Sequence, residues 1–389
     1  MHSWEQRKLG DVFEQTSNLV NPKEDEIELW SLTVEDGLTK KSDRYNREFL
    51  VKKDDNFKEV RPGDIVYNPM NMTLGAVGYN GMAKSVAVSG YYTTMVAKEN
   101  YDTYYINTWL KSPQAIRLYR TYATGSLIEK QRVQFPTLSI ISVAFPKYEE
   151  QTKIGNYFHF LDHLITLHQR KCDETKTLKK YMLQKMFPQN GEKVPEIRFD
   201  GFTEDWEQRK FADFTWDAGK RNKEDLDLEP YAITNEHGFI RQRDAHDDFG
   251  YMKDTDRKAY NIVQPNSFAY NPARINIGSI GYYKGVENVI VSSLYEVFQT
   301  DNYVNDRFLW HWFKSDEFPR WIERLQEGSV RLYFYYDKLC ECQLYMPSLE
   351  EQEKIASFLD ALDHLITLHQ RKCDELRSVK KFMLQNMFI

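Results

Sequence analysis

Few side chains in this sequence have the types and spacing that catalytic or metal-binding groups need. Cys340 and Cys342 lie one residue apart, but the only other cysteines are Cys172 and Cys373, so the second close pair of a zinc site is missing. The glycine-rich loops that bind nucleotide phosphates and the serine or histidine motifs of common hydrolases do not occur. The sequence therefore favours a protein with no catalytic residues, no metal site and reduced cysteines.

Two short motifs come closest to a catalytic loop. Asn68-Pro69 and Asn271-Pro272 resemble the Asn-Pro-Pro-aromatic loop of amino-methyltransferases, but both lack the second proline and the stacking aromatic residue. We interpret each as a turn before a strand. A nuclease carboxylate cluster has a looser spacing that no motif search excludes.

The chain repeats itself nearly from end to end, with an offset of 201–203 residues. The sequence WEQRK occurs at residues 4–8 and again at 206–210, and the block LDHLITLHQRKCDE occurs at 161–174 and 362–375. A period of this length is too long for a solenoid repeat. The chain is therefore two copies of one complete unit.

Each copy begins with a mixed region, residues 4–145 and 206–346. Short β-type runs at 64–67, 86–88 and 289–291 lie between Gly, Pro and Asn residues, and they predict strands joined by turns. Helices are expected over 104–122 and 308–325. The predicted fold class is α/β of an α+β-like kind, with two duplicated domains that contain mixed or antiparallel sheets.

A long helix is expected to close each copy, over residues 149–187 and 350–388. Pro146 and Pro347 precede these helices, and acidic pairs occupy their first turns, as the helix dipole favours. Steps of four and three residues trace a mostly apolar heptad seam, which predicts two antiparallel coiled-coil helices about a pseudo-two-fold axis. A helix packed in an ordinary bundle is the alternative. The seam histidines, His168 and His369, are expected to be buried core residues rather than ligands.

These features predict five segments. Residues 1–148 form the first domain, 149–187 the first spacer helix, 188–205 a linker, 206–347 the second domain, and 348–389 the second spacer helix.

Composition limits the class of protein. Hydrophobic residues make up 41% of the 389 residues and aromatic residues 14%, which is enough for ordered cores. No apolar run approaches the roughly 20 residues of a membrane span, and the amino end has no apolar signal region, so a cytoplasmic protein without a membrane partner is expected. The net charge of −6 argues against a simple basic nucleic-acid binder.

The whole chain resembles the specificity subunit of type I restriction–modification systems. The resemblance rests on WEQRK at the start of each half, on the segment PEIRFDGF at 195–202, and on the helix start EEQxKI that closes each half. Copy one lacks a counterpart of residues 195–205, so either the chain starts late or this lead-in serves mainly as the linker.

The resemblance implies a function and a set of partners. Such a subunit recognises double-stranded DNA at an asymmetric bipartite target through two target-recognition domains, and it catalyses no reaction. Two modification (methyltransferase) subunits dock on the shared helices, and restriction subunits with translocase and endonuclease activity join them. The chain itself would bind no cofactor, whereas S-adenosylmethionine, ATP and Mg²⁺ are implied for the partner subunits.

Candidate DNA-contacting residues come from comparing the copies, because shared positions build the fold and differing polar positions can read different bases. Arg and Lys suit guanine, and Asn and Gln suit adenine. A solvated loop is the alternative for each basic cluster. The candidates are Lys40, Lys41, Arg44, Arg47, Asn68, Asn71, Ser126, Lys130, Gln131 and Arg132 in copy one, and Arg241, Gln242, Arg243, Asn271, Arg274, Ser329, Arg331, Tyr333 and Tyr335 in copy two.

A second apolar stripe runs along each long helix beside the seam. We expect half or more of it to pack on the recognition domains and the remainder to bind the modification subunits, with Leu164, Leu167, Leu365 and Leu368 as candidate contacts. The stripe consists of Tyr157, Leu164, Leu167, Leu178 and Tyr181 and their counterparts Phe358, Leu365, Leu368, Val379 and Phe382. Two other classes of function stay open: an enzyme that methylates or cuts DNA alone, and a coiled-coil scaffold without a nucleic-acid role.

Overall fold

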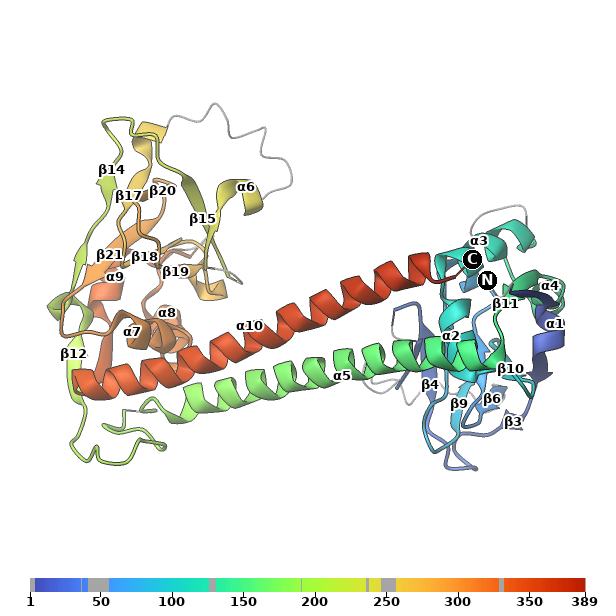
Figure 1. The fold of residues 1–389 in the computed structure, drawn as a ribbon. Helices are drawn as coiled ribbons and strands as arrows, with labels where there is room; N and C mark the ends of the chain where they lie inside the picture. The colour runs from blue at the N-terminus through green and yellow to red at the C-terminus, as the bar shows by residue number, and fades with distance from the viewer. Residues whose placement is uncertain are drawn as a thin grey trace. The chain divides into compact units, whose positions relative to one another are not determined.

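The structure is a computed structural model, and it describes residues 4–35, 37–40, 56–125, 131–189, 191–235, 238–245, 257–328 and 332–388. It divides into two compact units, whose elements are labelled in Figure 1. Unit 1 comprises Met1–Arg170 with Gln370–Ile389, and unit 2 comprises Lys171–His369. Each unit contains one mixed domain and a section of both long helices.

Unit 1 is built on small antiparallel sheets. Its largest sheet has the strand order β2 (Phe13–Thr16), β10 (Thr93–Ala97), β7 (Ile65–Tyr67) and β8 (Val77–Tyr79). The others are β3 (Leu19–Val20)–β6 (Phe57–Val60)–β9 (Val86–Ser89), the hairpin β4 (Trp30–Thr33)–β5 (Gly37–Lys40) and the pair β1 (Glu5–Lys8)–β11 (Ser142–Phe145). Strands β7 and β9 confirm the runs expected at 64–67 and 86–88.

Unit 2 repeats this plan with one larger sheet. Its four-stranded sheet has the order β13 (Thr215–Asp217), β21 (Glu296–Thr300), β18 (Ser267–Tyr270) and β19 (Ile280–Tyr283). A five-stranded sheet has the order β14 (Lys220–Arg221), β17 (Asn261–Val263), β20 (Val289–Val291), β15 (Pro230–Thr234) and β16 (Gly238–Arg241), and β12 (Glu207–Lys210) pairs with β22 (Gln343–Met346). Because β15 pairs with β20 in parallel and the other pairs are antiparallel, this sheet is mixed, as expected.

The single helix expected in each mixed region is wrong, because each is two helices. In unit 1, α2 (Thr103–Leu110) ends before Ser112, whose side chain caps α3 (Pro113–Tyr122). Pro113 has no N–H to donate, so it starts a helix and cannot continue one. Unit 2 has the same break between α7 (Asp306–Phe313) and α8 (Glu317–Leu325). The short helices are α1 (Leu9–Val12), α4 (Phe135–Ser139), α6 (Gln242–Ala245) and α9 (Tyr336–Glu341), with 3-10 turns η3 (Met72–Leu74), η5 (Phe211–Asp213), η7 (Arg257–Ala259) and η8 (Ile275–Ile277).

The two long helices are α5 (Tyr148–Lys185) and α10 (Leu349–Asn386), each of 38 residues. Their ends fall within two residues of the expected ones. The helices run antiparallel within each unit, because the Cys373 thiol contacts the Ile165 carbonyl at 3.6 Å in unit 1 and the Cys172 thiol contacts the Ile366 carbonyl at 3.8 Å in unit 2. Matching ion pairs flank these contacts at 2.5 Å, Lys380–Asp162 in unit 1 and Lys179–Asp363 in unit 2.

The heptad seam is the buried face of both helices. Its buried apolar members are Ile154, Phe158, Leu161, Cys172, Met186, Ile355, Leu359, Leu362, Cys373 and Leu376. His168 and His369 are only half-buried, so the expectation of two buried histidines is wrong. An imidazole at a seam position can keep its polar edge in water while its ring carbons pack, which lowers the cost of placing it there.

The segment expected as a linker is fixed to unit 2. Arg198 donates two hydrogen bonds to the buried Glu351 carboxylate of α10, from Nε to Oε1 at 2.7 Å and from Nη2 to Oε2 at 2.8 Å. Ile197 and Phe199 on either side of it pack against the core of the unit. Residues 191–205 therefore form an irregular strap over the start of α10.

Candidate nucleic-acid interface

Two loops far apart in sequence meet in unit 2. The Phe334 N–H donates to the Pro272 carbonyl at 3.1 Å, and Glu327 and Tyr333 exchange backbone hydrogen bonds at 2.8 and 2.7 Å. We name residues 271–278 together with 326–328 and 332–335 the unit 2 loop pair. It brings together four of the expected DNA-contacting residues, which are Asn271, Arg274, Tyr333 and Tyr335.

Local hydrogen bonds hold the first of these loops in shape. The Asn271 side-chain oxygen accepts the Ala273 N–H at 3.0 Å, which makes the turn expected at this Asn-Pro motif. Gly278 ends η8 with a φ of 89°, a conformation that L side chains rarely adopt. Asn271 therefore shapes the loop, whereas Arg274 is exposed and its guanidinium can contact a partner such as DNA.

The second loop of the pair carries an aromatic surface. The rings of Tyr333 and Tyr335 are stacked, with centroids 5.5 Å apart and planes 3° apart. Tyr333 is half-buried and Tyr335 is 47% exposed. Stacked phenol rings can pack on base edges and on the thymine methyl group, while their hydroxyls donate hydrogen bonds.

Unit 1 contains the equivalent loop pair, residues 68–75 together with 123–125 and 131–134. The Val133 N–H donates to the Pro69 carbonyl at 2.9 Å, and Thr124 and Arg132 exchange backbone hydrogen bonds. Asn68 makes the same turn as Asn271, because its side-chain oxygen accepts the Met70 N–H at 3.0 Å. The exposed Asn71 and Arg132 and the half-buried Gln131 supply the polar surface here.

Sequence reasoning missed a cation at the unit 1 loop pair. Arg120 of α3 donates from Nε to the Thr73 carbonyl at 3.3 Å and is exposed. Because 47 residues separate Arg120 from Thr73 in sequence, no local pattern could have indicated their contact.

The other basic candidates lie at the base of a hairpin. Tyr231 of β15 pairs with Arg241 of β16, whereas the turn end of this hairpin lies by the loop pair, where Ser279 Oγ donates to the Ile233 carbonyl at 2.9 Å. Lys40 occupies the same place in unit 1. These candidates are therefore separated from the loop pairs by the length of a strand.

Acidic neighbours partly neutralise the basic side chains of the hairpins. Lys40 and Lys84 lie 3.3 and 3.1 Å from the Glu28 carboxylate, and hydrogen bonds from Lys84, Trp30 and Lys40 lower the pKa of Glu28 to about 2. In unit 2, Arg243 lies 3.7 Å from Glu229. Gln242 is buried, so its side chain is not available at the surface, and the expectation that it contacts DNA is wrong. Its place on the inner face of α6 explains the burial. Lys41, Arg44, Arg47, Ser126, Lys130, Ser329 and Arg331 lie outside the described residues.

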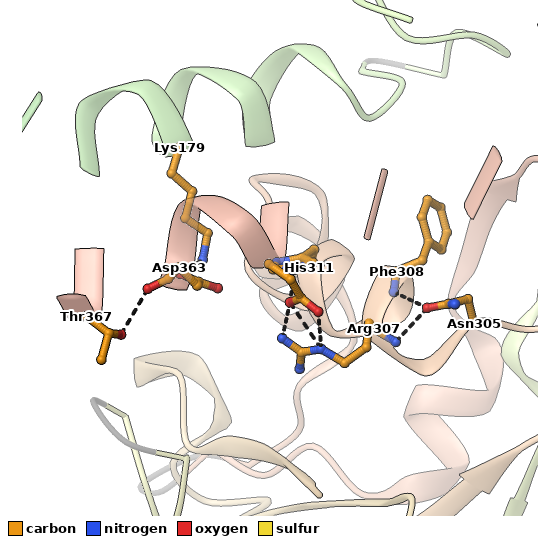
Figure 2. Close-up of polar contacts among 8 residues, drawn as sticks. Lys179, Asn305, Arg307, Phe308, His311, Asp363 and Thr367 are labelled. Carbon is orange, nitrogen blue, oxygen red and sulfur yellow. Dashed lines mark hydrogen bonds and ion pairs between the residues drawn. The ribbon is translucent and has the colours of Figure 1, made fainter. Parts of the chain in front are cut away.

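A charged cluster joins the unit 2 domain to α10 (Figure 2). Asp360 accepts hydrogen bonds from both Arg307 and His311, the latter at 2.9 Å, and the neighbouring Asp363 pairs with Lys179. Burial alone would raise the pKa of Asp360, but the His311 and Arg307 hydrogen bonds hold this pKa well below its usual value. Burial lowers the pKa of His311, which favours the neutral imidazole.

The same cluster offers three side chains of the types that bind metal ions, one histidine and two aspartates. His311, Asp360 and Asp363 place one ligand atom each within 4.8 Å of one another. Arg307 and Lys179 already bind the two carboxylates and would repel a cation. The cluster is therefore a set of ion pairs that fastens helices together.

The apolar stripe of the long helices is mostly uncovered. Seven of its ten residues are exposed, from Tyr157 at 37% to Phe382 at 62%. Leu164, Leu167 and Phe358 are half-buried, and Leu365 and Leu368 are 41% and 51% exposed. The expectation that half or more of the stripe packs on the domains is therefore wrong, because the domains contact the helices mainly through the seam face and its flanks. No helix among the described residues is long and apolar enough to cross a membrane.

A family model for the type I restriction modification DNA specificity domain matches residues 1–177 and 203–378. The chain belongs to this family. It is a sequence-specific DNA-recognition subunit and is the non-catalytic part of a type I restriction–modification system.

Relatives of this DNA-specificity family match along most of the chain. The type I restriction enzyme MjaVIII specificity subunit of Methanocaldococcus jannaschii is 22% identical over 367 residues, which cover 87% of this chain and 82% of that protein. The S subunit of the type I restriction–modification system from M. genitalium has a TM-score of 0.64 at 13% identity, covering 99% of this chain and 96% of that chain. A chain from a type I R-M system studied for complex assembly and conformational transition has a TM-score of 0.50 at 13% identity, covering 99% and 97%. The fold of the family is thus shared at low identity.

Proposed function

We propose that each unit reads one half of an asymmetric bipartite DNA target, and that the loop pairs carry the reading residues. The supporting observation is that both units join the same two loops by the same backbone hydrogen bond, Phe334 to Pro272 and Val133 to Pro69, while the exposed side chains differ. A shared backbone arrangement that presents different side chains suits recognition of two different half-sites.

The chemistry of the loop pairs indicates how the half-sites differ. Arg274 suits the O6 and N7 acceptors of guanine, and the Tyr333–Tyr335 stack suits a thymine methyl group. In unit 1, Asn71 suits adenine and Arg132 suits guanine. In this proposal residues 1–148 and 206–347 are the two reading domains. The basic side chains of the hairpins, Lys40, Arg241 and Arg243, contact DNA phosphates rather than nucleobases.

We also propose that the exposed stripe holds two modification subunits, one on each unit. Exposed leucine, valine and aromatic side chains in a row are costly in water and fit an apolar partner surface. Restriction subunits would join this assembly. S-adenosylmethionine, ATP and Mg²⁺ would bind to those partners, where the chemistry takes place.

The test is a comparison of methylated sequences in hosts that carry the system with single variants of this chain. Arg274→Ala and Tyr335→Ala should relax or weaken one half-site by about 1–3 kcal/mol, roughly tenfold to a hundredfold, and leave the other unchanged. Asn71→Ala and Arg132→Ala should affect only the other half-site. Lys210→Ala, an exposed lysine on β12, is the matched control and should alter neither. Changes in both half-sites from one loop pair, or in none, would contradict the proposal.

A further inference from the structure

The two domains are fastened to their long helices by a shared clamp. Gln151 of α5 accepts the Asp102 N–H at 3.1 Å and donates to the Pro146 carbonyl at 2.9 Å. Gln352 of α10 makes the same two bonds, to the Asn305 N–H at 2.8 Å and the Pro347 carbonyl at 3.0 Å. Both glutamines are buried. This clamp cannot distinguish one domain from the other.

Two turns further along α10, the unit 2 joint is ionic. Asp360 accepts from Arg307 Nε at 3.0 Å and from His311 Nε2 at 2.9 Å, and both donors are side chains of α7. The side chains of Arg307 and Asp360 are 20% and 33% exposed, and His311 is fully buried. The carboxylate is therefore required wherever this domain docks, since without it the Arg307 cation and the buried His311 imidazole would both lose their partner.

The unit 1 joint has an aromatic contact at the equivalent place. His159 takes the position of Asp360, and Tyr104 takes that of Arg307. The Tyr104 ring meets the His159 ring edge-on, with centroids 4.6 Å apart, and its hydroxyl donates to Asp162 at 2.8 Å. The third position, His311 in unit 2, is Thr108 here, and its hydroxyl bonds to the Tyr104 carbonyl.

A second difference lies one turn earlier on the helices. Gly155 of α5 packs so closely that an added Cβ would lie 2.5 Å from the Asp102 carboxylate and 3.0 Å from the Tyr105 nitrogen. The equivalent position in α10 is Ala356, which has that Cβ and is buried. Domain 1 therefore fits a helix with glycine at this position, and domain 2 fits a helix with alanine there.

We propose that positions 155 and 159 of α5, and 356 and 360 of α10, form a key that decides which recognition domain each helix can accept. The rest of the two helices distinguishes the domains poorly, because the helices are identical over 161–174 and 362–375 and share the glutamine clamp. Domain 2 on α5 would leave Arg307 and His311 facing His159. Domain 1 on α10 would set the Ala356 methyl against Asp102 and leave Asp360 without its cation. Each mismatched pairing is penalised, so a recognition domain moved to the other position should dock well only when these helix residues move with it.

The test is a chain in which residues 4–145 are replaced by 206–346, so that both positions carry domain 2. It is expressed with modification subunits, and the methylated sequence is read. With Gly155→Ala and His159→Asp in α5, it should methylate a symmetric target made of two unit 2 half-sites. With α5 unchanged, methylation of that target should fall about tenfold or more, the loss expected for hydrogen bonds to a charged group. Equal methylation by both versions would overturn the proposal.

Point variants of the natural chain decide the matter if neither duplicated chain folds. Asp360→His should weaken reading of the unit 2 half-site about tenfold and speed hydrogen exchange at the α7 amides but not at α2, and adding Arg307→Tyr and His311→Thr should reverse both effects. Failure of the triple variant to restore either readout would refute the key. The inference rests on the proposed two-half-site reading, and the exchange readout separates the two, because it does not depend on DNA.

Discussion

The buried ion pair of unit 2 gives a prediction whose size follows from the structure. The Arg198 and Glu351 side chains are 16% and 1% exposed and form two hydrogen bonds of 2.7 and 2.8 Å. Arg198→Leu would leave a carboxylate buried with no cation. Breaking one partner of such a pair costs about 3–5 kcal/mol.

The expected effect is a large fall in the melting temperature of unit 2. A domain of about 200 residues loses about 2–4 °C per kcal/mol, so the substitution should lower the transition of unit 2 by about 6–20 °C. Scanning calorimetry of the whole chain measures it. The double variant Arg198→Leu/Glu351→Leu should recover most of the loss, because two apolar side chains pack there without an orphan charge.

Unit 1 supplies the control for this prediction. Glu150 is the counterpart of Glu351, but it is half-buried and its bond comes from Trp4 Nε1 at 3.3 Å. Glu150→Leu should therefore cost no more than about 1 kcal/mol. An Arg198→Leu transition within about 1 °C of the natural chain, or a double variant as unstable as the single one, would refute the reasoning.

Three further predictions concern docking, pH and packing. Leu167→Asp with Leu368→Asp should abolish co-purification of a modification subunit, whereas the adjacent exposed pair Thr166→Asp with Thr367→Asp should not; retained binding would place the docking surface elsewhere. Burial lowers the pKa of Lys314 to about 8, so the unfolded chain binds more protons than the folded one between about pH 8 and 10.5, and stability should rise with pH above about 8. Denaturant unfolding at pH 7 to 9.5 should show this rise, and Lys314→Met should remove it; an unchanged slope in that variant would be contrary evidence. Gly155→Ala should destabilise unit 1 by about 1–3 kcal/mol, since its Cβ meets Asp102, and a neutral result in thermal melts would show that the joint can move aside.

Repetition and periodicity made much of the fold predictable. The duplicated blocks indicated two units, and the steps of four and three along 154–186 indicated the paired helices, because seam burial follows directly from helical geometry. The single helix over 104–122 was wrong because the apolar pattern continues through Ser112-Pro113, where backbone chemistry stops it.

The candidate site was less predictable, since its parts meet through the tertiary fold. Asn271, Arg274 and Tyr333 were candidates from the sequence, but their meeting depends on the Phe334–Pro272 hydrogen bond, which no local pattern encodes. The joint has a sequence signal of its own, because His159 and Asp360 differ just before an identical 14-residue block. A residue that differs between the copies beside an identical block marks a position where the two helices are not interchangeable. Only the contacts with Arg307 and Tyr104 show that the position bears on domain docking.

The central claim is that the loop pairs read the half-sites, and a loop graft tests it most directly. Residues 271–278 and 326–335 of unit 2 would be replaced by residues 68–75 and 123–134 of unit 1, with both joints left intact. Sequencing of methylated DNA from a host carrying this chain should then show a target whose two half-sites are both that of unit 1. An unchanged asymmetric target from the folded, methylating complex would contradict the account.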